Sequence, residues 1–466
     1  MKTIVGITVG PIVETISESK KISEIANASL FFSTIVEEFL KKISKNERYK
    51  IITPSFNGED NKDKFYPDRI VLEVKENLDK KIILEEIENI YFSIISSEEK
   101  LLELKDYLNF NIIVESFEEE KNIKDIFNYL NGIEVIKNFS VNSDSKDILK
   151  NINDYLKKKN EKKSLNPSYA VDFGSDSFNS ERGYRAIIAL DIDKMTTFSQ
   201  NNIETLGDIY KVSSSIYDYI TELNDFLEKK VNNGKKEGLV LYSAGDDILA
   251  ILNPKYIFEF IEFACNTLNK SFKKFKNRNL SVSFGIFVCY AKYPIKEAIN
   301  KAHSLLFGTA KEKRNTASIL FQKHSGQSFK LNLYDLIDKT SGVENTFNYK
   351  NPFFNYSKEN INFELEDTAK DRLLNTIVQK VSMNEFVFRY IITKKDRIDN
   401  YLEDLFDEKG IGKNQLTMLK DLLYYIGNLD NEITDTEDKF QENLFQVLSF
   451  FRMLKFYVSK GKGENN

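Results

Sequence analysis

The chain has 466 residues, too many for one ordinary hydrophobic core, and about one domain per 150 residues predicts roughly three units. Its formal net charge of −5 argues against a protein that coats nucleic acid through bulk positive charge, so RNA contacts should be local or shared with partners. The two cysteines, Cys265 and Cys289, are too few for a zinc ribbon or a disulfide framework and favour a reducing, cytoplasmic location. No apolar stretch approaches the roughly 20 residues that cross a bilayer, so we expect no membrane insertion.

Strand-like and helix-like patterns alternate over residues 1–139 and predict a first α+β domain. The expected elements are strands at 3–9, 69–74 and 110–114 and a helix rich in small residues around 25–33. Residues 140–183 are polar, and they predict a helix that is followed by a linker.

Residues 184–330 predict a second α+β domain. Its expected elements are strand 184–190, helix 203–230, hairpin 239–252, helix 255–276, strand 280–289, helix 294–311 and strand 316–322. The first five of these, with the hairpin counted as two strands, follow the order β-α-β-β-α-β, the split arrangement of ferredoxin-like and palm domains. Residues 331–354 are expected to be a linker, and residues 355–466 have the helical periodicity of a small bundle.

Four carboxylates lie at the ends of apolar runs in this second domain. Asp246 and Asp247 occupy the tip of the hairpin, where a buried acidic pair needs either a cation or a turn to account for it. Asp191 and Asp193 end the first strand at alternate positions. If this strand and the hairpin are neighbours in one sheet, the carboxylates gather at one edge and form an oxygen-rich site suited to Mg²⁺ or Mn²⁺.

The residues around these carboxylates fit two-cation chemistry on a triphosphate. Ile192 lies between the first two carboxylates and can point back into the core. Gly245, with Ser243 and Ala244 before it, allows close backbone approach to a phosphate or ribose. Lys311, near the end of a predicted helix, can reach a triphosphate as a point charge.

These residues resemble the large polymerase-palm subunit of type III CRISPR effector complexes, whose second palm carries a Gly-Gly-Asp-Asp hairpin and is related to diguanylate cyclases. The similar segments occur in the family's order, at 191–193, 242–247, 283–286 and 293–315, with weaker likeness at 7–12, 26–33 and 66–70. The resemblance implies an α+β fold of two ferredoxin-like, nucleotide cyclase-like palm domains followed by a C-terminal helical domain.

The resemblance also implies a function: conversion of ATP to cyclic oligoadenylate, or to an AMP conjugate, when the complex captures target RNA. The partners would be guide RNA, target RNA and other effector subunits. The catalytic residues would be Asp191, Asp246 and Asp247, which with Ile192 would also bind the metal ions. The remaining nucleotide-binding positions would be Asp193, Ser243, Ala244, Gly245 and Lys311, together with Ile192.

The sequence departs from the family pattern in three places. Many members begin with a His-Asp nuclease domain, but the only histidines here, His303 and His324, are not next to an Asp, so we expect no DNA cleavage by that route. The cysteines of the family's zinc module are missing. Ala244 replaces the first glycine of the hairpin and adds one methyl group where a nucleotide may pass.

Each feature has an ordinary structural explanation when it is taken alone. A single Asp-x-Asp is common at strand ends, Asp246 and Asp247 can form a plain hairpin turn, and Lys311 can stabilise a helix dipole. Because these features occur together and in this order along the chain, they favour a site that binds nucleotide and metal. Two other functions stay open: a catalytically silent scaffold subunit of the same complex, and a free-standing nucleotide cyclase.

Overall fold

The computed structural model describes residues 2–56, 66–76, 78–118, 125–137, 145–163, 183–232, 235–275, 279–338, 346–349, 353–354, 420–422, 445–450 and 452–453. Most of the predicted C-terminal bundle therefore lies outside the described residues, and the short described pieces of it are helical. None of the described helices is both long and apolar enough to cross a membrane. Cys265 and Cys289 are buried and free, in agreement with the sequence analysis.

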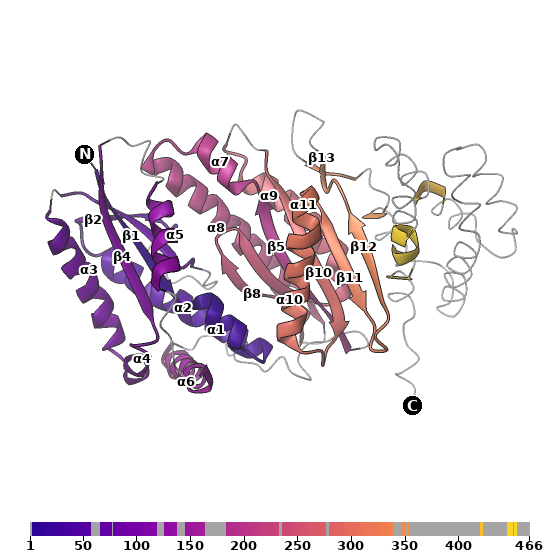
Figure 1. Cartoon of the computed structure of the whole chain (residues 1–466), viewed down its shortest axis with the longest axis horizontal. Helices are drawn as coiled ribbons and strands as arrows, with labels where there is room; N and C mark the ends of the chain where they lie inside the picture. Colours follow the sequence, from indigo (N-terminus) through magenta and orange to yellow (C-terminus); the bar gives the residue numbers. More distant parts are fainter. Residues whose placement is uncertain are drawn as a thin grey trace, which may run out of the picture.

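The first α+β unit is built on a four-stranded antiparallel sheet in the order β2-β3-β1-β4 (Figure 1). This order is that of a ferredoxin-like fold, as predicted. Its strands are β1 (Lys2–Gly10), β2 (Tyr49–Thr53), β3 (Arg69–Val74) and β4 (Asn109–Phe117). Its helices are α1 (Ile12–Glu18), α2 (Ile22–Ile43), α3 (Lys80–Ile95), α4 (Glu99–Glu103), α5 (Asp125–Lys137) and α6 (Ser145–Lys163).

Helix α6 is the helix predicted at the start of the polar segment 140–183, and it packs on the first unit. Its buried residues Ile148, Ile152, Tyr155 and Leu156 join the core beneath the first sheet. The amide of Asn27 in α2 also donates a hydrogen bond to Asn153 in α6 at 2.7 Å. The apolar stripe of α6 therefore extends the core of the first unit.

The second unit contains a six-stranded sheet in the order β12-β11-β10-β5-β9-β8. Its strands are β5 (Tyr184–Asp193), β8 (Gly238–Ala244), β9 (Asp247–Leu252), β10 (Ser281–Tyr290), β11 (Ala317–Gln322) and β12 (Ser328–Leu333). The four strands β10-β5-β9-β8 form the predicted ferredoxin-like sheet, to which β11 adds in parallel and β12 antiparallel. The described residues also form two separate, short strand pairs: β6 (Val231–Asn232) with β7 (Lys235–Lys236), and β13 (Ile337–Asp338) with β14 (Thr346–Phe347).

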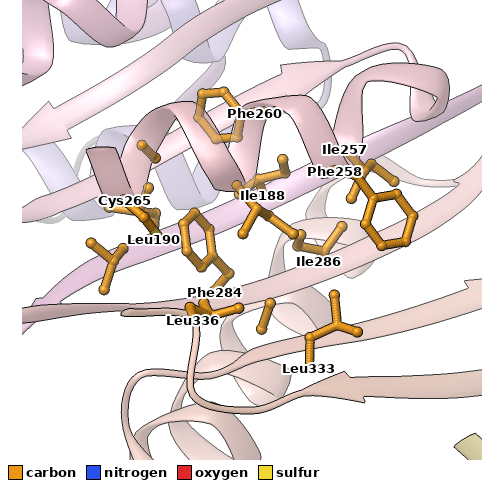
Figure 2. Close-up of a cluster of buried hydrophobic side chains, with 14 of the residues drawn as sticks. Ile188, Leu190, Ile257, Phe258, Phe260, Cys265, Phe284, Ile286, Leu333 and Leu336 are labelled. Atoms are coloured by element: carbon orange, nitrogen blue, oxygen red, sulfur yellow. The ribbon is translucent and has the colours of Figure 1, made fainter. Parts of the chain in front are cut away.

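Helices cover both faces of this sheet, which is why β5 and β10 are almost continuously apolar. The helices are α7 (Met195–Asn202), α8 (Leu206–Glu228), α9 (Ile257–Ser271), α10 (Ile295–Leu305), a π-helical turn (Leu306–Ala310) and α11 (Lys311–Lys313), with a 3₁₀ turn at Pro254–Tyr256. Helices α8 and α9 contribute to the core on one face, where Phe260 of α9 lies above Ile188 of β5 and Phe284 of β10 (Figure 2).

The opposite face of the second sheet is shared between α10 and the start of α2 from the first unit. Ile22 and Ile25 of α2 lie in the same buried cluster as Leu241 of β8 and Ile187 of β5. In return, the start of α8 packs against the first sheet, where Leu206 and Ile209 join a cluster with strand residues. Two helices therefore join the units: α2 of the first unit packs on the second sheet, and α8 of the second unit packs on the first sheet.

The predicted elements agree with the structure in type and order, with differences at their ends. Strand β5 continues to Asp193, so Asp191 lies inside the strand and not after it. The single helix expected at 294–311 is divided by the π-helical turn. Strand β12 crosses position 330, and β13 and β14 lie in the segment expected to be a linker, while the domain boundaries themselves stay predictions.

Gly285 of β10 allows α10 and the turn after it to lie directly on the sheet. A Cβ atom at this position would overlap the carbonyl oxygen of Ala302 and the backbone of Leu306. Gly308, on the exposed side of the π-helical turn, has no atom within 4 Å of the corresponding position.

We expect Gly285→Ala to lower the melting temperature of the chain, because the overlap forces the helix away from the sheet at a cost of about 1–3 kcal/mol or more. Gly308→Ala is the matched control and should be neutral or stabilising, since alanine favours helix by up to about 1 kcal/mol. Thermal unfolding followed by circular dichroism measures both. Equal melting temperatures for the two variants would contradict the close packing at Gly285.

Candidate functional site

The hairpin β8–β9 and strand β5 bring three of the predicted carboxylates to one edge of the second sheet. Asp191 of β5 is in register with Asp247 of β9, and Asp247 is in turn in register with Ala244 of β8. Gly245 and Asp246 form the turn between the two strands. Gly245 has a φ of +64°, a left-handed conformation that glycine adopts without a steric penalty.

The three carboxyls at this edge all have raised pKa values. Burial raises the pKa of Asp191 to about 7, with the charges of Asp246 and Asp247 acting in the same direction and Lys311 acting against them. Burial and the neighbouring Asp246 raise the pKa of Asp247 to about 6. Burial also raises the pKa of Asp246. Burial is thus the main reason why these three carboxyls resist ionisation.

Lys311 is the cation that faces these carboxylates. Its ammonium forms an ion pair with Asp191 and lies 3.3 Å from Asp193 Oδ1. Lys311 is the first residue of α11, which the π-helical turn joins to α10. Because α10 packs directly on Gly285, this packing determines how far Lys311 lies from the sheet. The sequence analysis expected this lysine to contact phosphate, and the structure places it on the carboxylates.

Asp193 has a different environment from the other three carboxylates. Its side chain is completely buried and accepts hydrogen bonds at 2.8 Å from Ser281 Oγ, from Ser283 Oγ and from the backbone amide of Asn315. Asn315 is itself in a left-handed conformation, with φ of 52°. Asp193 therefore ties β5 to β10 and to the segment that follows Lys311.

The remaining predicted positions surround the turn. The side chain of Ile192 is buried in the core, and the β5–β9 ladder ends at Asp191, which leaves the Ile192 carbonyl beyond the last paired residues. Ser243 is buried, and its hydroxyl has no hydrogen-bond partner among the residues that the structure describes. The backbone of Ala244 pairs with that of Asp247.

Two groups of residues were missed by the sequence analysis. Ser281, Ser283 and Asn315 bind Asp193, although Ser283 and Asn315 lie in segments that carried the family resemblance. Arg69 of β3, in the first unit, exerts a positive charge on Asp246 that opposes the effect of burial on its pKa. A residue from the first sheet thus faces the hairpin of the second, which sequence spacing alone does not reveal.

The chemistry of the edge suits a divalent cation that prefers oxygen ligands. Asp191, Asp246 and Asp247, with the Ile192 carbonyl, are the groups that would hold it, and a bound cation would stabilise the ionised form of these buried carboxyls. Within the described ranges, no three acidic, histidine or cysteine side chains converge as a complete ligand set. The ammonium of Lys311 already pairs with Asp191, so a cation that binds Asp191 would have to displace this ammonium.

Comparison with known proteins identifies the second unit. Residues 184–319 match the family described as Cas10/Cmr2, second palm domain. The CRISPR system Cmr subunit Cmr2 of Pyrococcus furiosus is 29% identical over 203 residues, which cover 37% of this chain and 23% of that protein. The chain therefore spans only about a quarter of this relative.

The fold of nearly the whole chain also matches Csm1 in crystal structures. The Csm1–Csm4 subcomplex of the type III-A CRISPR-Csm interference complex has a TM-score of 0.53 at 12% identity, over 98% of this chain and 70% of that one. The Csm1–Csm4 cassette with one ATP has a TM-score of 0.52 at 12% identity, over 97% and 70% of the two chains. The cassette with cA3 has a TM-score of 0.51 at 13% identity, over 99% and 70%. At these identities the likeness concerns the fold.

We expect the carboxylate edge to make the fold less stable as pH rises. The folded-state pKa of Asp191 lies near 7, above the ordinary aspartate value, so between about pH 4 and 7 the folded chain holds a proton that the unfolded chain lacks. The free energy of unfolding should fall as pH rises through this range. Asp191→Asn should show a flatter dependence, measured by urea unfolding from pH 5 to 8 without divalent cations.

Glu88→Gln, which changes an exposed carboxylate on α3, is the control and should keep the wild-type slope. If Asp191→Asn keeps the same slope as this control, the carboxyl of Asp191 does not hold the extra proton.

Proposed function

Since the chain carries a Cas10/Cmr2 second palm domain, we propose that it is the large subunit of a type III CRISPR effector complex and makes a second messenger from ATP. The observation that carries the proposal is the convergence of Asp191, Asp246 and Asp247 on one sheet edge, beneath the ammonium of Lys311. Carboxylates from two separate strands are what a palm needs to bind the cations that accompany a nucleoside triphosphate.

The proposed reaction is a nucleotidyl transfer. The oxygen of a 3′-hydroxyl forms a bond to the α-phosphorus of ATP, the bond between that phosphorus and the bridging oxygen breaks, and pyrophosphate and a proton leave. Two bound Mg²⁺ or Mn²⁺ ions supply charge neutralisation and lower the pKa of the attacking hydroxyl. The product is a cyclic oligoadenylate or an AMP conjugate.

The residues of the chain have separate tasks in this reaction. Asp191, Asp246 and Asp247 hold the cations, and the left-handed turn at Gly245 keeps the backbone close to the substrate. Lys311 exchanges its carboxylate partner for the phosphates and stabilises the negative charge that moves onto the leaving group. Asp193 is a positioning residue, because its acceptor oxygens are already used by Ser281, Ser283 and Asn315.

The setting of the reaction follows from the same family. We place the chain in the cytoplasm, in a complex with other effector subunits, guide RNA and target RNA. Crystal structures of the related Csm1–Csm4 cassette with one ATP and with cA3 support the choice of substrate and product class. The activity is expected to depend on target RNA in the assembled complex.

We expect the double substitution Asp246→Asn and Asp247→Asn to lower product formation by at least about a hundredfold, because the cations lose two anionic ligands. Chromatography of reactions of the assembled complex with labelled ATP and target RNA measures the product. Glu88→Gln should leave the yield unchanged. Assembly, followed by size-exclusion chromatography, should be the same for all three proteins.

Two results would reject the assignment. Normal product yield from the double variant would show that the hairpin does not hold the reacting groups. A wild-type complex that assembles with RNA but forms no product from ATP, with either Mg²⁺ or Mn²⁺, would instead identify the chain as a scaffold. Mass spectrometry of the product then separates a cyclic oligoadenylate from an AMP conjugate.

A further inference from the structure

An exposed aromatic side chain lies one helical turn before Lys311. Phe307, in the π-helical turn, is 55% exposed, a value that none of the other large hydrophobic residues among the described segments exceeds. Single exposed apolar residues are common on protein surfaces and do not by themselves indicate a function. Phe307 is of interest because it lies one helical turn from Lys311, which pairs with Asp191 at the carboxylate edge.

The two flanks of α10 and the π-helical turn face different parts of the sheet. On one flank, Lys301 donates a hydrogen bond to Gln322 of β11 at 2.6 Å, and Thr309 pairs with Lys330 of β12 at 2.9 Å. This flank therefore faces β11 and β12, at the end of the sheet away from the acidic hairpin.

The other flank carries His303, Phe307 and Lys311 at intervals of four residues, which places them in one row along the helix. The rings of His303 and Phe307 confirm the row, since they stack with centroids 6.0 Å apart and planes inclined by 6°. Lys311 ends the row on Asp191 of β5. The row thus leads from the stacked pair of His303 and Phe307, of which Phe307 is exposed, to the carboxylate edge (Figure 1 shows α10 and α11 in line over the sheet).

The free side of the Phe307 ring is open to a flat ligand. Ser304 and Gly308, its neighbours on the exposed surface, are small, and no atom lies within 4 Å of the Cβ position of Gly308. Burial lowers the pKa of His303, so its ring is neutral at physiological pH and adds no charge to the stack. Aromatic rings in this setting bind the face of a nucleobase.

The spacing fits a nucleotide. Phe307 and Lys311 are separated by less than one turn of the π-helical segment, so the ring and the ammonium are neighbours, as a base and its phosphates are across a ribose. Lys311 and the cation-binding carboxylates would hold the phosphates at one end, and the exposed ring lies at the other. A purely apolar occupant would leave Lys311 and the carboxylates unused.

We infer that Phe307 is a base-stacking residue, which receives the adenine ring of an ATP whose triphosphate lies at Lys311 and the carboxylate edge. This inference rests on the proposed function, and it adds a specificity-determining residue to it. It predicts that base and phosphate recognition can be separated by substitution at Phe307.

The experiment compares two ligands, ATP and inorganic tripolyphosphate, with the full chain in Mn²⁺. Phe307→Ala should weaken ATP binding by about five- to a hundredfold, the range that base stacking supplies, and should leave tripolyphosphate binding within about twofold of wild type. Phe307→Trp should retain ATP binding, because it keeps an aromatic face. Phe92→Ala, at a residue of α3 that is 46% exposed, is the control and should change neither affinity. Calorimetric titration measures all four proteins.

The possible outcomes are distinct. Unchanged ATP binding by Phe307→Ala, or equal loss of both ligands, would overturn the stacking role, the second result pointing to a structural role. Loss of ATP binding by Phe307→Trp as well would also overturn it. A separate result would overturn the proposed function. In that case the wild-type protein binds ATP, but the variant with Asp246→Asn and Asp247→Asn makes product at the wild-type rate.

Discussion

The site depends on one buried carboxylate, that of Asp193. A fully buried charge is tolerated only when donors satisfy it, and here two serine hydroxyls and a backbone amide do so. Because these donors come from β10 and from the segment after α11, the same interaction fixes three parts of the chain. It holds β5 in place, and it brings the chain back to the sheet immediately after Lys311. It thereby supports the positions of Asp191 and Lys311, which the strand ladders and the packing of α10 on Gly285 also hold.

A second constraint is the strand register. Side chains alternate between the two faces of a sheet, so a shift of one residue between β5 and β9 would move Asp191 away from Asp247 and exchange the apolar rows that the two helical layers contact. Helices cover both faces of this sheet, which makes such a shift costly. The acidic edge is therefore held in place by the apolar residues of the same strands, such as Ile188 and Leu190.

The sequence was sufficient for the elements whose patterns are strong. Continuous apolar strands, the small-residue hairpin turn and the amphipathic helices predicted the ferredoxin-like sheet of the second unit and brought Asp191, Asp246 and Asp247 to one edge. For the first unit, the ferredoxin-like order came only from the family resemblance, and strand β2 was not predicted. It was insufficient where a role depends on contacts between distant segments. The donors to Asp193, the approach of Arg69 to the hairpin and the packing of α6 on the first sheet all join residues far apart in the chain. The π-helical turn has no periodic signature, because it is only five residues long.

The charges at the edge explain how one arrangement can serve both the free protein and the nucleotide-binding protein. In the free protein, the ammonium of Lys311 pairs with Asp191, and burial raises the pKa values of the three carboxyls. Under the proposed function, divalent cations bound with a triphosphate would stabilise the ionised carboxylates, and Lys311 would then face the phosphates. Because Lys311 lies on a short helix after a π-helical turn, it can change partner while Asp193 keeps its donors. Under the proposed function, cation binding would offset the cost of ionising these buried carboxyls, which would favour binding of nucleotide and cation together over binding of either alone.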